Sequence, residues 1–375
     1  MTGNDWLQRL EEGLRNAAEQ VQKVRGGKKE WLVFGTGSTT ELYLPCFEAE
    51  GIDPIAYVDN NTSKYGTGYY GKPVVPASKI AGYADAAVLL CTDDRRTCRE
   101  IGAQLCSIGI PYLLVAEYVY ARHAQEIMEN AAALDETSLA VYADRILAHL
   151  ENRPLQHMEH AQYFAVPEFY GCAYREVFVD IGAYVGDTIE QYLYHRQGGF
   201  SRIYAIEPNA ASFAALSARV ERLRREWALE DGRIRLIQAG IGKESCQGHV
   251  VPGSGTNAQL GSRISEEGAS DEGETLVIYK VDDLFRDEHI GFLKADIEGR
   301  ELDMLQGGIN VIRRDRPKIA VCIYHNCSDM YRIFSYLREE LTDYRFAVRH
   351  HAHSFAETVL YAYPVEMGGV NRCLF

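Results

Sequence analysis

The order of hydrophobic and polar positions divides the chain into two series of alternating strands and helices. The first series begins after an amphipathic helix over residues 5–23, whose apolar side chains recur every three or four residues. Short apolar runs then predict strands at 31–34, 55–58, 87–91 and 112–115, with helices through 42–47 and over 97–108. Such alternation is typical of a parallel sheet, so residues 28–116 are expected to form a small Rossmann-like unit.

The second series occupies the C-terminal half. It predicts strands at 177–181, 202–206, 235–239, 276–281, 291–295, 318–324, 344–349 and 358–363, and helices at 188–195, 211–229, 300–306 and 329–341. Because no helix separates the last two strands, we expect them to form an antiparallel pair at one edge of the sheet.

Between the two series, residues from about 117 to 160 have a helical and polar pattern without strand features. We therefore expect an α/β protein in four parts. These are an N-terminal helix (1–27), a small Rossmann-like domain (28–116), a helical connector (117–169) and a larger α/β domain (170–375).

Composition narrows the classes of function. The 39 basic and 53 acidic residues give a formal charge of −14, which argues against nucleic acid as a partner. No apolar run approaches the roughly 20 residues of a membrane helix, and the N-terminus has no apolar block typical of a secretory signal. The nine cysteines include no CxxC pair, which favours a reduced, cytoplasmic setting. A homo-oligomer remains open.

One strand-turn-helix stretch has the features of a cofactor site. The apolar run 177–181 contains Asp180 and leads into a Gly182-x-x-x-Gly186 turn, where glycine permits a tight backbone and close approach of a ligand. The next strand ends at Glu207, an acid placed to accept hydrogen bonds from ribose hydroxyls.

This turn differs from the G-x-G-x-x-G turn that holds a dinucleotide diphosphate. A cofactor with one ribose and no phosphate fits better, and S-adenosylmethionine is such a cofactor. The alternative is a glycine turn that binds nothing. The residues expected at the cofactor are Asp180, Gly182, Ala183, Tyr184, Gly186, Thr188, Glu207, Pro208, Asn209, Gln238, Ala239 and Asp296.

Several segments in the same order resemble the FkbM-type methyltransferases, a branch of the class I methyltransferases. The segments are DIGAYVGDT, AIEPN, IQAGIG, FLKADIEGRELDML, CIYHNCSDMYRIFSYL, YRFAVRHHA and ETVLYAYP, and they span about residues 170–364. The resemblance implies a seven-stranded, mostly parallel sheet with an antiparallel last strand, and methyl transfer, usually to a hydroxyl. At Tyr184 this chain departs from the family, which usually has Asn or a small residue there.

Methyl transfer to a hydroxyl is helped by a general base near the carboxyl ends of the strands. Asp296 and Glu298 follow one strand, and alternation along an extended segment would place both carboxylates on one side. His325 follows the next strand and is our candidate base, with the two acids orienting it or the acceptor. In the structural alternatives, Glu298 caps the following helix and His325 is an ordinary polar residue.

A cluster of polar residues in the loop between the last two strands is a further candidate, for acceptor binding. It includes His350, His351, His353 and Glu357. Its spacing matches no dedicated metal-ligand motif, so we expect no metal, although a divalent ion orienting a diol is an alternative. The loop 253–270, rich in glycine and serine, is either a substrate lid or a solvated connection.

The N-terminal unit has a second glycine loop. Gly35 and Gly37 supply two glycines of a dinucleotide fingerprint, Thr40 occupies the third position, and Asp59 ends the next strand. This pattern resembles the small Rossmann-like domains found beside sugar-modifying enzymes. It is consistent with binding of a nucleotide, a nucleotide-sugar or part of the substrate, and equally with a degenerate module that serves packing.

The function that these patterns favour is O-methylation, by S-adenosylmethionine, of a hydroxyl on a small-molecule or glycan-linked acceptor. One alternative is methyl transfer to an amine, which needs less base catalysis. The other is a protein without enzymatic activity that binds a nucleotide or nucleotide-sugar through its two Rossmann-like units.

Overall fold

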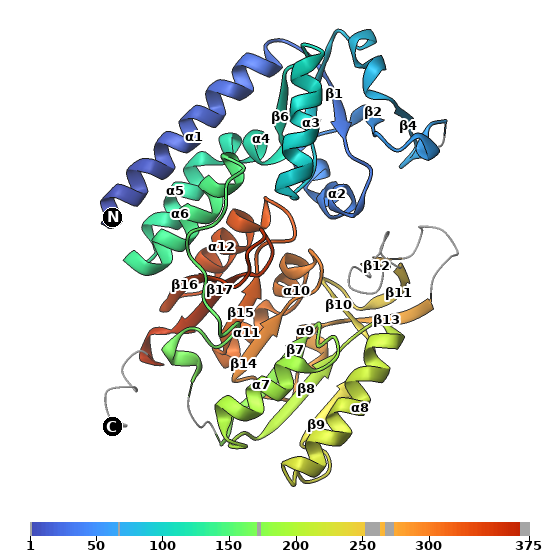
Figure 1. Ribbon diagram of the computed structural model, residues 1–375. Coiled ribbons are helices and arrows are strands. Elements are labelled where there is room, and N and C mark those ends of the chain that lie inside the picture. Colours follow the sequence, from blue (N-terminus) through green and yellow to red (C-terminus); the bar gives the residue numbers. More distant parts are fainter. Residues whose placement is uncertain (1, 67, 171–173, 252–262, 267–273, 368–375) are drawn as a thin grey trace. The chain divides into compact units, whose positions relative to one another are not determined.

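The computed structural model describes residues 2–66, 68–170, 174–251, 263–266 and 274–367 (Figure 1). The chain forms two compact units. The first unit consists of Met1–Met158 with Tyr324–Arg332 and Ala352–Glu357, and the second of Glu159–Ile323, Ile333–His351 and Thr358–Phe375. None of the described helices is both long and apolar enough to cross a lipid bilayer.

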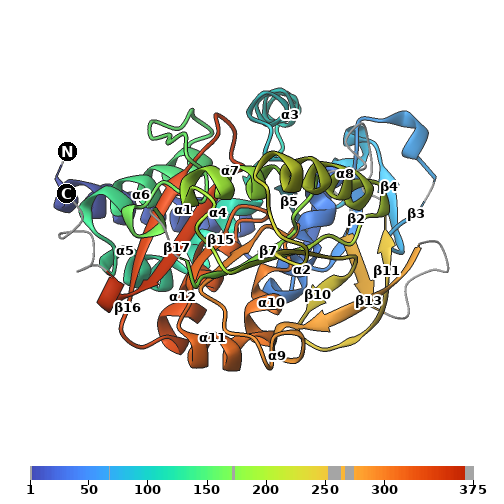
Figure 2. The same ribbon diagram turned by 90° about the horizontal axis from the view of Figure 1, so that it is seen from below.

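The first unit contains a six-stranded sheet in the order β3-β4-β2-β1-β5-β6. Its strands are β1 (Glu30–Phe34), β2 (Pro54–Val58), β3 (Gly68–Tyr69), β4 (Lys72–Val75), β5 (Ala86–Leu90) and β6 (Tyr112–Leu114). Every pairing is parallel except that of β3 with β4. Helices α2 (Ser38–Glu50) and α3 (Arg95–Ser107) cover opposite faces (Figure 2). The predicted Rossmann-like unit is confirmed, whereas the pattern gave no indication of β3 and β4.

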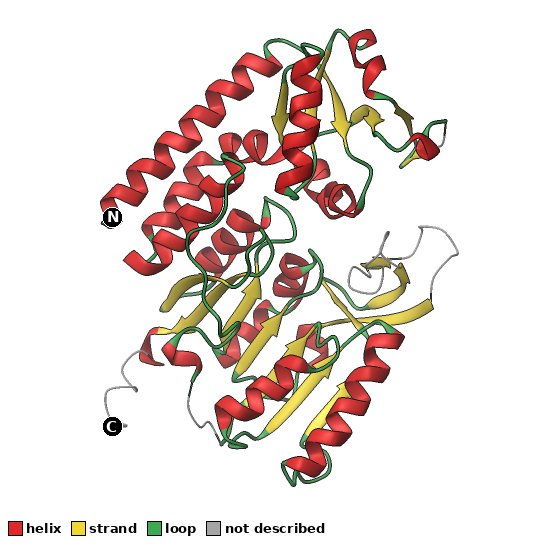
Figure 3. Cartoon of the chain, in the orientation of Figure 1, coloured by secondary structure: helices red, strands yellow, loops and turns green. Residues whose placement is uncertain are grey.

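Four further helices belong to the first unit. They are α1 (Gly3–Arg25), α4 (Val115–Arg122), α5 (Ala124–Ala132) and α6 (Glu136–Leu150), and α1 packs against the other three (Figure 3). A capping box between Thr2 and Asp5 satisfies backbone N–H groups at the start of α1. The expectation that this region is polar was wrong for α6, which is buried along most of its length.

Two short segments from late in the sequence complete the first unit. They are residues 324–332 and 352–357, whose neighbours in sequence belong to the second unit. Hydrogen bonds join Asn130 to the carbonyl of Tyr331 (3.1 Å), Tyr142 to that of Met330 (3.1 Å) and Arg145 to that of Phe355 (2.9 Å). The unit therefore depends on chain that lies about 200 residues downstream of α5 and α6.

The second unit contains a seven-stranded sheet in the order β16-β17-β15-β14-β7-β8-β9. Its strands are β7 (Val177–Ile181), β8 (Arg202–Ile206), β9 (Ile234–Ile237), β14 (Phe292–Ala295), β15 (Lys318–Cys322), β16 (Tyr344–His350) and β17 (Thr358–Pro364). Strand β17 is antiparallel to both neighbours, which confirms the predicted antiparallel pair at the edge.

Helices on both faces of this sheet form a three-layered unit. Helices α7 (Asp187–Arg196) and α8 (Ala210–Glu226) cover one face, and α10 (Glu301–Gly307) and α11 (Ile309–Asp315) the other (Figure 2). Helix α12 (Asp329–Glu340) follows β15, and a 3₁₀ turn at Pro167–Phe169 precedes β7. The apolar positions of the central strands are fully buried, so the core lies within the sheet and its helices.

A smaller four-stranded sheet departs from the prediction. It contains β10 (Gly240–Gly242), β11 (Cys246–Val251), β12 (Arg263–Glu266) and β13 (Glu274–Lys280), and α9 (Val281–Leu284) follows it. The strand predicted at 276–281 thus belongs to this sheet and not to the main one, because its apolar pattern cannot specify its pairing partner. Most of the predicted loop 253–270 lies outside the described residues.

Candidate active site

The direction of chain crossing changes beside β7, which marks the candidate site. From β7 the chain passes through α7 to β8 on one side, whereas β14 pairs with β7 on the other. In open α/β sheets, ligands bind outside the carboxyl ends of the strands at such a switch point. The predicted glycine turn follows β7, and Asp296 follows β14, so both lie at this place.

The glycines of this turn are required by the packing of the chain itself. Gly182 and Gly186 have φ of 75° and 83°, where side chains are disfavoured. A Cβ on Gly182 would lie 1.8 Å from the carbonyl oxygen of Asp296, and one on Gly186 would lie 2.8 Å from Leu216. Tyr184 also has a positive φ of 46°, a conformation that glycine and asparagine adopt more readily than tyrosine.

Glu207 is fixed by the turn. Its two carboxylate oxygens each accept one backbone N–H, from Tyr184 and from Asn209, both at 2.9 Å. Burial, together with the nearby charge of Asp180, raises the pKa of Glu207 despite these hydrogen bonds. A carboxylate accepts about four hydrogen bonds, so capacity for two ligand hydroxyls remains.

Asp180 forms a buried ion pair that the sequence analysis did not identify. Its register partner on β14 is Lys294, and the Lys294 ammonium lies 3.0 Å from the carboxylate. The ammonium also donates to the carbonyl oxygen of Gly182 (2.7 Å), so it ties the turn to β14. Asp180 is fully buried, and its carboxylate supports the turn through Lys294.

Burial affects the two partners of this ion pair differently. It raises the pKa of the Asp180 carboxyl to about 6, although Lys294 acts in the opposite direction. Burial also acts to lower the pKa of Lys294, but the charges of Asp180 and Asp296 outweigh it and raise that pKa. Lys294 therefore stays protonated near neutral pH.

Tyr163 is a site residue that sequence reasoning missed. Its hydroxyl donates to the carboxylate of Asp296 at 2.9 Å and lies 3.6 Å from the sulfur of Cys322. The Lys294 ammonium lies 5.1 Å from the centre of its ring. Tyr163 is buried and has a positive φ of 66°, and its backbone N–H donates to the hydroxyl of Tyr361. It lies outside every predicted motif, so no local pattern could have identified it.

The other predicted cofactor residues surround the same strand ends. Thr188 is buried in the first turn of α7, and Ala183 and Ala239 are also buried. Pro208 is half-buried between Glu207 and Asn209, whose side chain caps α8 by accepting from the N–H groups of residues 211 and 212. Gln238 is exposed after β9. Their contact with a cofactor stays a prediction.

The segment that contains Asp296 and Glu298 differs from the extended conformation that we assumed. Strand β14 ends at Ala295, and Glu298 and Gly299 form a turn with φ of 57° and 89°. Alternation along a strand therefore does not relate the two carboxylates. Glu301 reaches back and accepts the N–H of Ile297 at 2.7 Å, which fixes this turn at the start of α10.

The predicted histidines have different environments. His325 is buried and its ring packs on Tyr324, and both belong to the first unit. In the second unit, His350 is fully buried and bonded to the hydroxyl of Thr358, its partner in the strand pair.

Two further loop residues also have separate partners. His351 is bonded through one ring nitrogen to the Glu159 carbonyl and through the other to the Tyr361 hydroxyl. Glu357, in the first unit, lies 3.5 Å from the hydroxyl of Tyr324. The predicted acceptor-binding cluster is thus divided among separate structural contacts, and its role stays a prediction.

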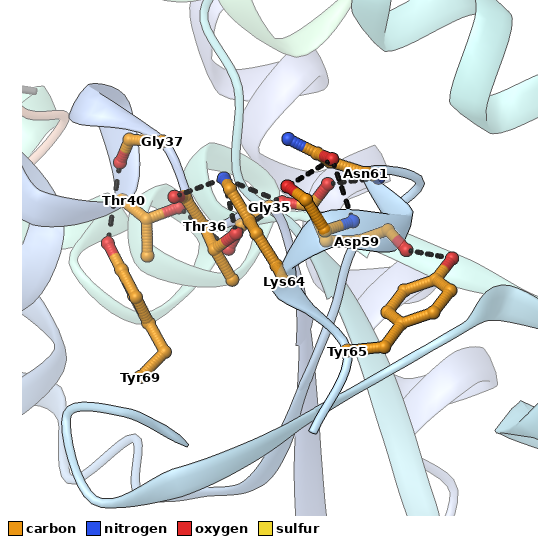
Figure 4. Close-up of polar contacts among 10 residues, drawn as sticks. Gly35, Thr36, Gly37, Thr40, Asp59, Asn61, Lys64, Tyr65 and Tyr69 are labelled. Atoms are coloured by element: carbon orange, nitrogen blue, oxygen red, sulfur yellow. Dashed lines mark hydrogen bonds and ion pairs between the residues drawn. The ribbon is translucent and has the colours of Figure 1, made fainter. Parts of the chain in front are cut away.

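The predicted residues of the N-terminal unit come together. Gly35 and Gly37 follow β1, Asp59 follows β2, and all three line one cavity (Figure 4). Lys64 joins them although no sequence motif indicated it, and its ammonium lies 3.2 Å from the Asp59 carboxylate.

The sheet order, the glycine turn and the acid after β8 define the second unit as a class I methyltransferase fold. Residues 180–348 match the family profile of the methyltransferase FkbM domain. The protein is therefore a methyltransferase that carries an FkbM domain, as the resemblance predicted. This family uses S-adenosylmethionine as its methyl donor.

A solved FkbM methyltransferase from Methylobacillus flagellatus KT has a similar fold. The two are 21% identical with a TM-score of 0.54, over 96% of this chain and 99% of that one. An rRNA methylase from Streptococcus thermophilus is 13% identical with a TM-score of 0.32, over 52% of this chain and 88% of that one. No curated protein matches the chain significantly.

Proposed function

We propose that this methyltransferase transfers the methyl group of S-adenosylmethionine to a hydroxyl of a small-molecule or glycan-linked acceptor. The observation that supports this most is the position of Glu207, fixed by the N–H groups of Tyr184 and Asn209 beside the glycine turn. A carboxylate with two lone pairs remaining suits the two ribose hydroxyls of the cofactor. When bound, the cofactor supplies an already activated methyl group.

For the acceptor, the hydroxyl of Tyr163 and the carboxylate of Asp296 provide a polar pair at the end of β14. A carboxylate there can accept a hydrogen bond from an acceptor hydroxyl and orient it. We retain His325 as the candidate base, because an alcohol must lose its proton as the methyl group is transferred. An amine acceptor needs less base catalysis, and that is the alternative.

The test is a methylation assay with the full-length protein, S-adenosylmethionine labelled in its methyl group, and a panel of saccharides and amines. We expect a labelled methyl ether, recognised by NMR, and a loss of turnover of at least roughly tenfold in His325→Ala. A matched control is His289→Ala, which alters an exposed histidine that precedes β14, away from the carboxyl end of that strand. Unchanged turnover in His325→Ala, or an N-methyl product, would contradict the proposal.

A further inference from the structure

A second ligand site is indicated by a cavity in the first unit. Its volume is about 390 Å³, within the range of about 300–1,000 Å³ typical of small-molecule sites. It is lined by the loop after β1, by residues following β2 and β5, and by one side of α3. Since β2 and β5 flank β1 on opposite sides, the cavity lies at the switch point of this sheet, where such folds bind ligands.

Asp59 provides the first recognition element of this cavity. One carboxylate oxygen accepts from the Thr36 hydroxyl and from Lys64, and the other accepts the N–H of Asn61 at 2.8 Å (Figure 4). Three of about four acceptor positions are thus filled, which leaves capacity for one ligand hydroxyl. Burial acts to raise the pKa of Asp59, but these hydrogen bonds outweigh it and lower the pKa, so the ligand must supply the proton.

The loop between β1 and α2 provides the second element. Helix α2 begins at Ser38, and its N-cap residue, Gly37, has no side chain to cap the first N–H groups. These groups and the helix dipole favour an anion. Lys64 adds a positive charge to the cavity wall. Contacts of its ammonium with the carbonyl and hydroxyl oxygens of Thr36, at 2.9 and 2.8 Å, fix its position beside the loop.

The third element argues against a dinucleotide. The position of the third glycine in a dinucleotide fingerprint is Thr40, which is fully buried and donates to the carbonyl of Gly35. That glycine normally allows close packing of helix on strand around a diphosphate bridge. The cavity also has room beside Gly37, because a Cβ on that residue would meet no described atom within 4 Å.

We propose that this cavity binds a ribonucleoside diphosphate, with a ribose hydroxyl donating to Asp59 and the phosphates at the N-terminus of α2. The ligand is independent of the methyl donor, whose proposed site lies on the other unit. It would bring a nucleotide, or an acceptor attached to one, to the methyltransferase.

Isothermal titration of the full-length protein with ADP, GDP, CDP and UDP tests the proposal, with 2′-deoxy and 3′-deoxy counterparts of any that binds. We expect at least one ribonucleotide to bind, and at least one deoxy counterpart to bind several-fold more weakly. Asp59→Asn and Gly37→Val should each weaken binding at least tenfold, the first by removing charge and the second by filling space. Gly37 has φ −105°, which valine tolerates.

Two controls separate binding from folding. Asp53→Asn changes a largely exposed acid of the same unit and should leave nucleotide affinity unchanged. All variants should retain the affinity of the wild type for S-adenosylhomocysteine, which also separates this proposal from the proposed function. The proposal is overturned if no nucleoside diphosphate binds at 1 mM, if both variants bind as the wild type does, or if S-adenosylhomocysteine competes with the nucleotide.

Discussion

The carboxyl ends of β1 and β7 have the same backbone arrangement but different electrostatics. In each, a glycine with positive φ packs against the carbonyl that follows the strand across the switch point. The acid that follows the next strand in sequence binds the glycine loop. Among the described residues, the hydrogen-bond partners of Glu207 are two backbone N–H groups, whereas Asp59 is also held by a hydroxyl and by Lys64.

This difference shows how one fold can suit two ligands. In the second unit the lysine of the site, Lys294, is buried beneath the turn and neutralises Asp180. Lys64, in the first unit, is part of the cavity wall and about one-third exposed. The charge of Lys64 in the cavity wall favours a phosphate. Lys294 lies beneath the turn and pairs with Asp180, which leaves Glu207 to hold hydroxyls.

The comparison predicts that losing the two lysines has unequal effects on stability. Lys294→Met leaves the buried charge of Asp180 without a partner, which should cost about 3–5 kcal/mol. Lys64→Met breaks a partly exposed pair and should cost less than about 1 kcal/mol. Urea denaturation measures both. Adding Asp180→Asn to Lys294→Met should restore much of the loss, and equal losses for the two lysines would contradict the comparison.

The two glycines should respond in the same direction but to different degrees. An added Cβ would lie 1.8 Å from a carbonyl oxygen at Gly182 and 2.7 Å from the Cys91 carbonyl oxygen at Gly35. With the positive φ at both, we expect Gly182→Ala to cost about 2–4 kcal/mol and Gly35→Ala somewhat less. Thermal unfolding is the measurement. Gly37→Ala, with open space and negative φ, should stay within about 0.5 kcal/mol.

The two acids should have separate ligands. Glu207→Gln replaces one acceptor oxygen with an N–H donor, so affinity for S-adenosylhomocysteine should fall about tenfold, or about 1.4 kcal/mol. Nucleotide affinity should not change. Asp59→Asn should show the reverse pattern in the same titrations. A variant that lost both affinities equally would indicate unfolding rather than a specific contact.

The pH dependence of stability is the test with the smallest expected effect. Folding raises the pKa of Asp180 to about 6, so the folded state holds this proton more tightly and acidification favours it. Lys294 acts to lower this pKa, so in Lys294→Met the pKa of Asp180 rises further and acidification favours the folded variant more than the folded wild type. The deficit of Lys294→Met should therefore shrink between pH 8 and pH 5. Folding lowers the pKa of Asp59, so its contribution to stability is lost only at a pH below the ordinary pKa of an aspartate. The deficit of Lys64→Met should therefore stay constant between pH 8 and pH 5. A shrinking deficit in both would contradict this assignment.

Much of both sheets could be predicted, because strands that are buried on both faces show as apolar runs. The predicted strands 177–181 and 202–206 coincide with β7 and β8. The predicted glycine turn and Glu207 also lie together at the switch point. The hairpin of β3 and β4 was missed because Gly68–Tyr69 and Lys72–Val75 are too short to show a period.

The rest of the site depends on contacts between distant residues. Tyr163 and Asp296 are separated by 133 positions, and nothing near either residue indicates the other. The ion pair of Asp180 and Lys294 did leave an indication, because each is a lone charge in an apolar strand. Opposite charges in two buried parallel strands favour register partners, and that reasoning could have identified Lys294 from the sequence.

The late segments of the first unit have a consequence for how the protein is made. Tyr331 donates its hydroxyl to Glu50, and the carbonyl of Phe355 accepts from Arg145, so these contacts join residues more than 200 positions apart in sequence. During synthesis from the N-terminus, the first unit must wait with those partners exposed until residue 357 has left the ribosome. A nascent chain stalled before that point should be trapped by chaperones or cleaved by proteases.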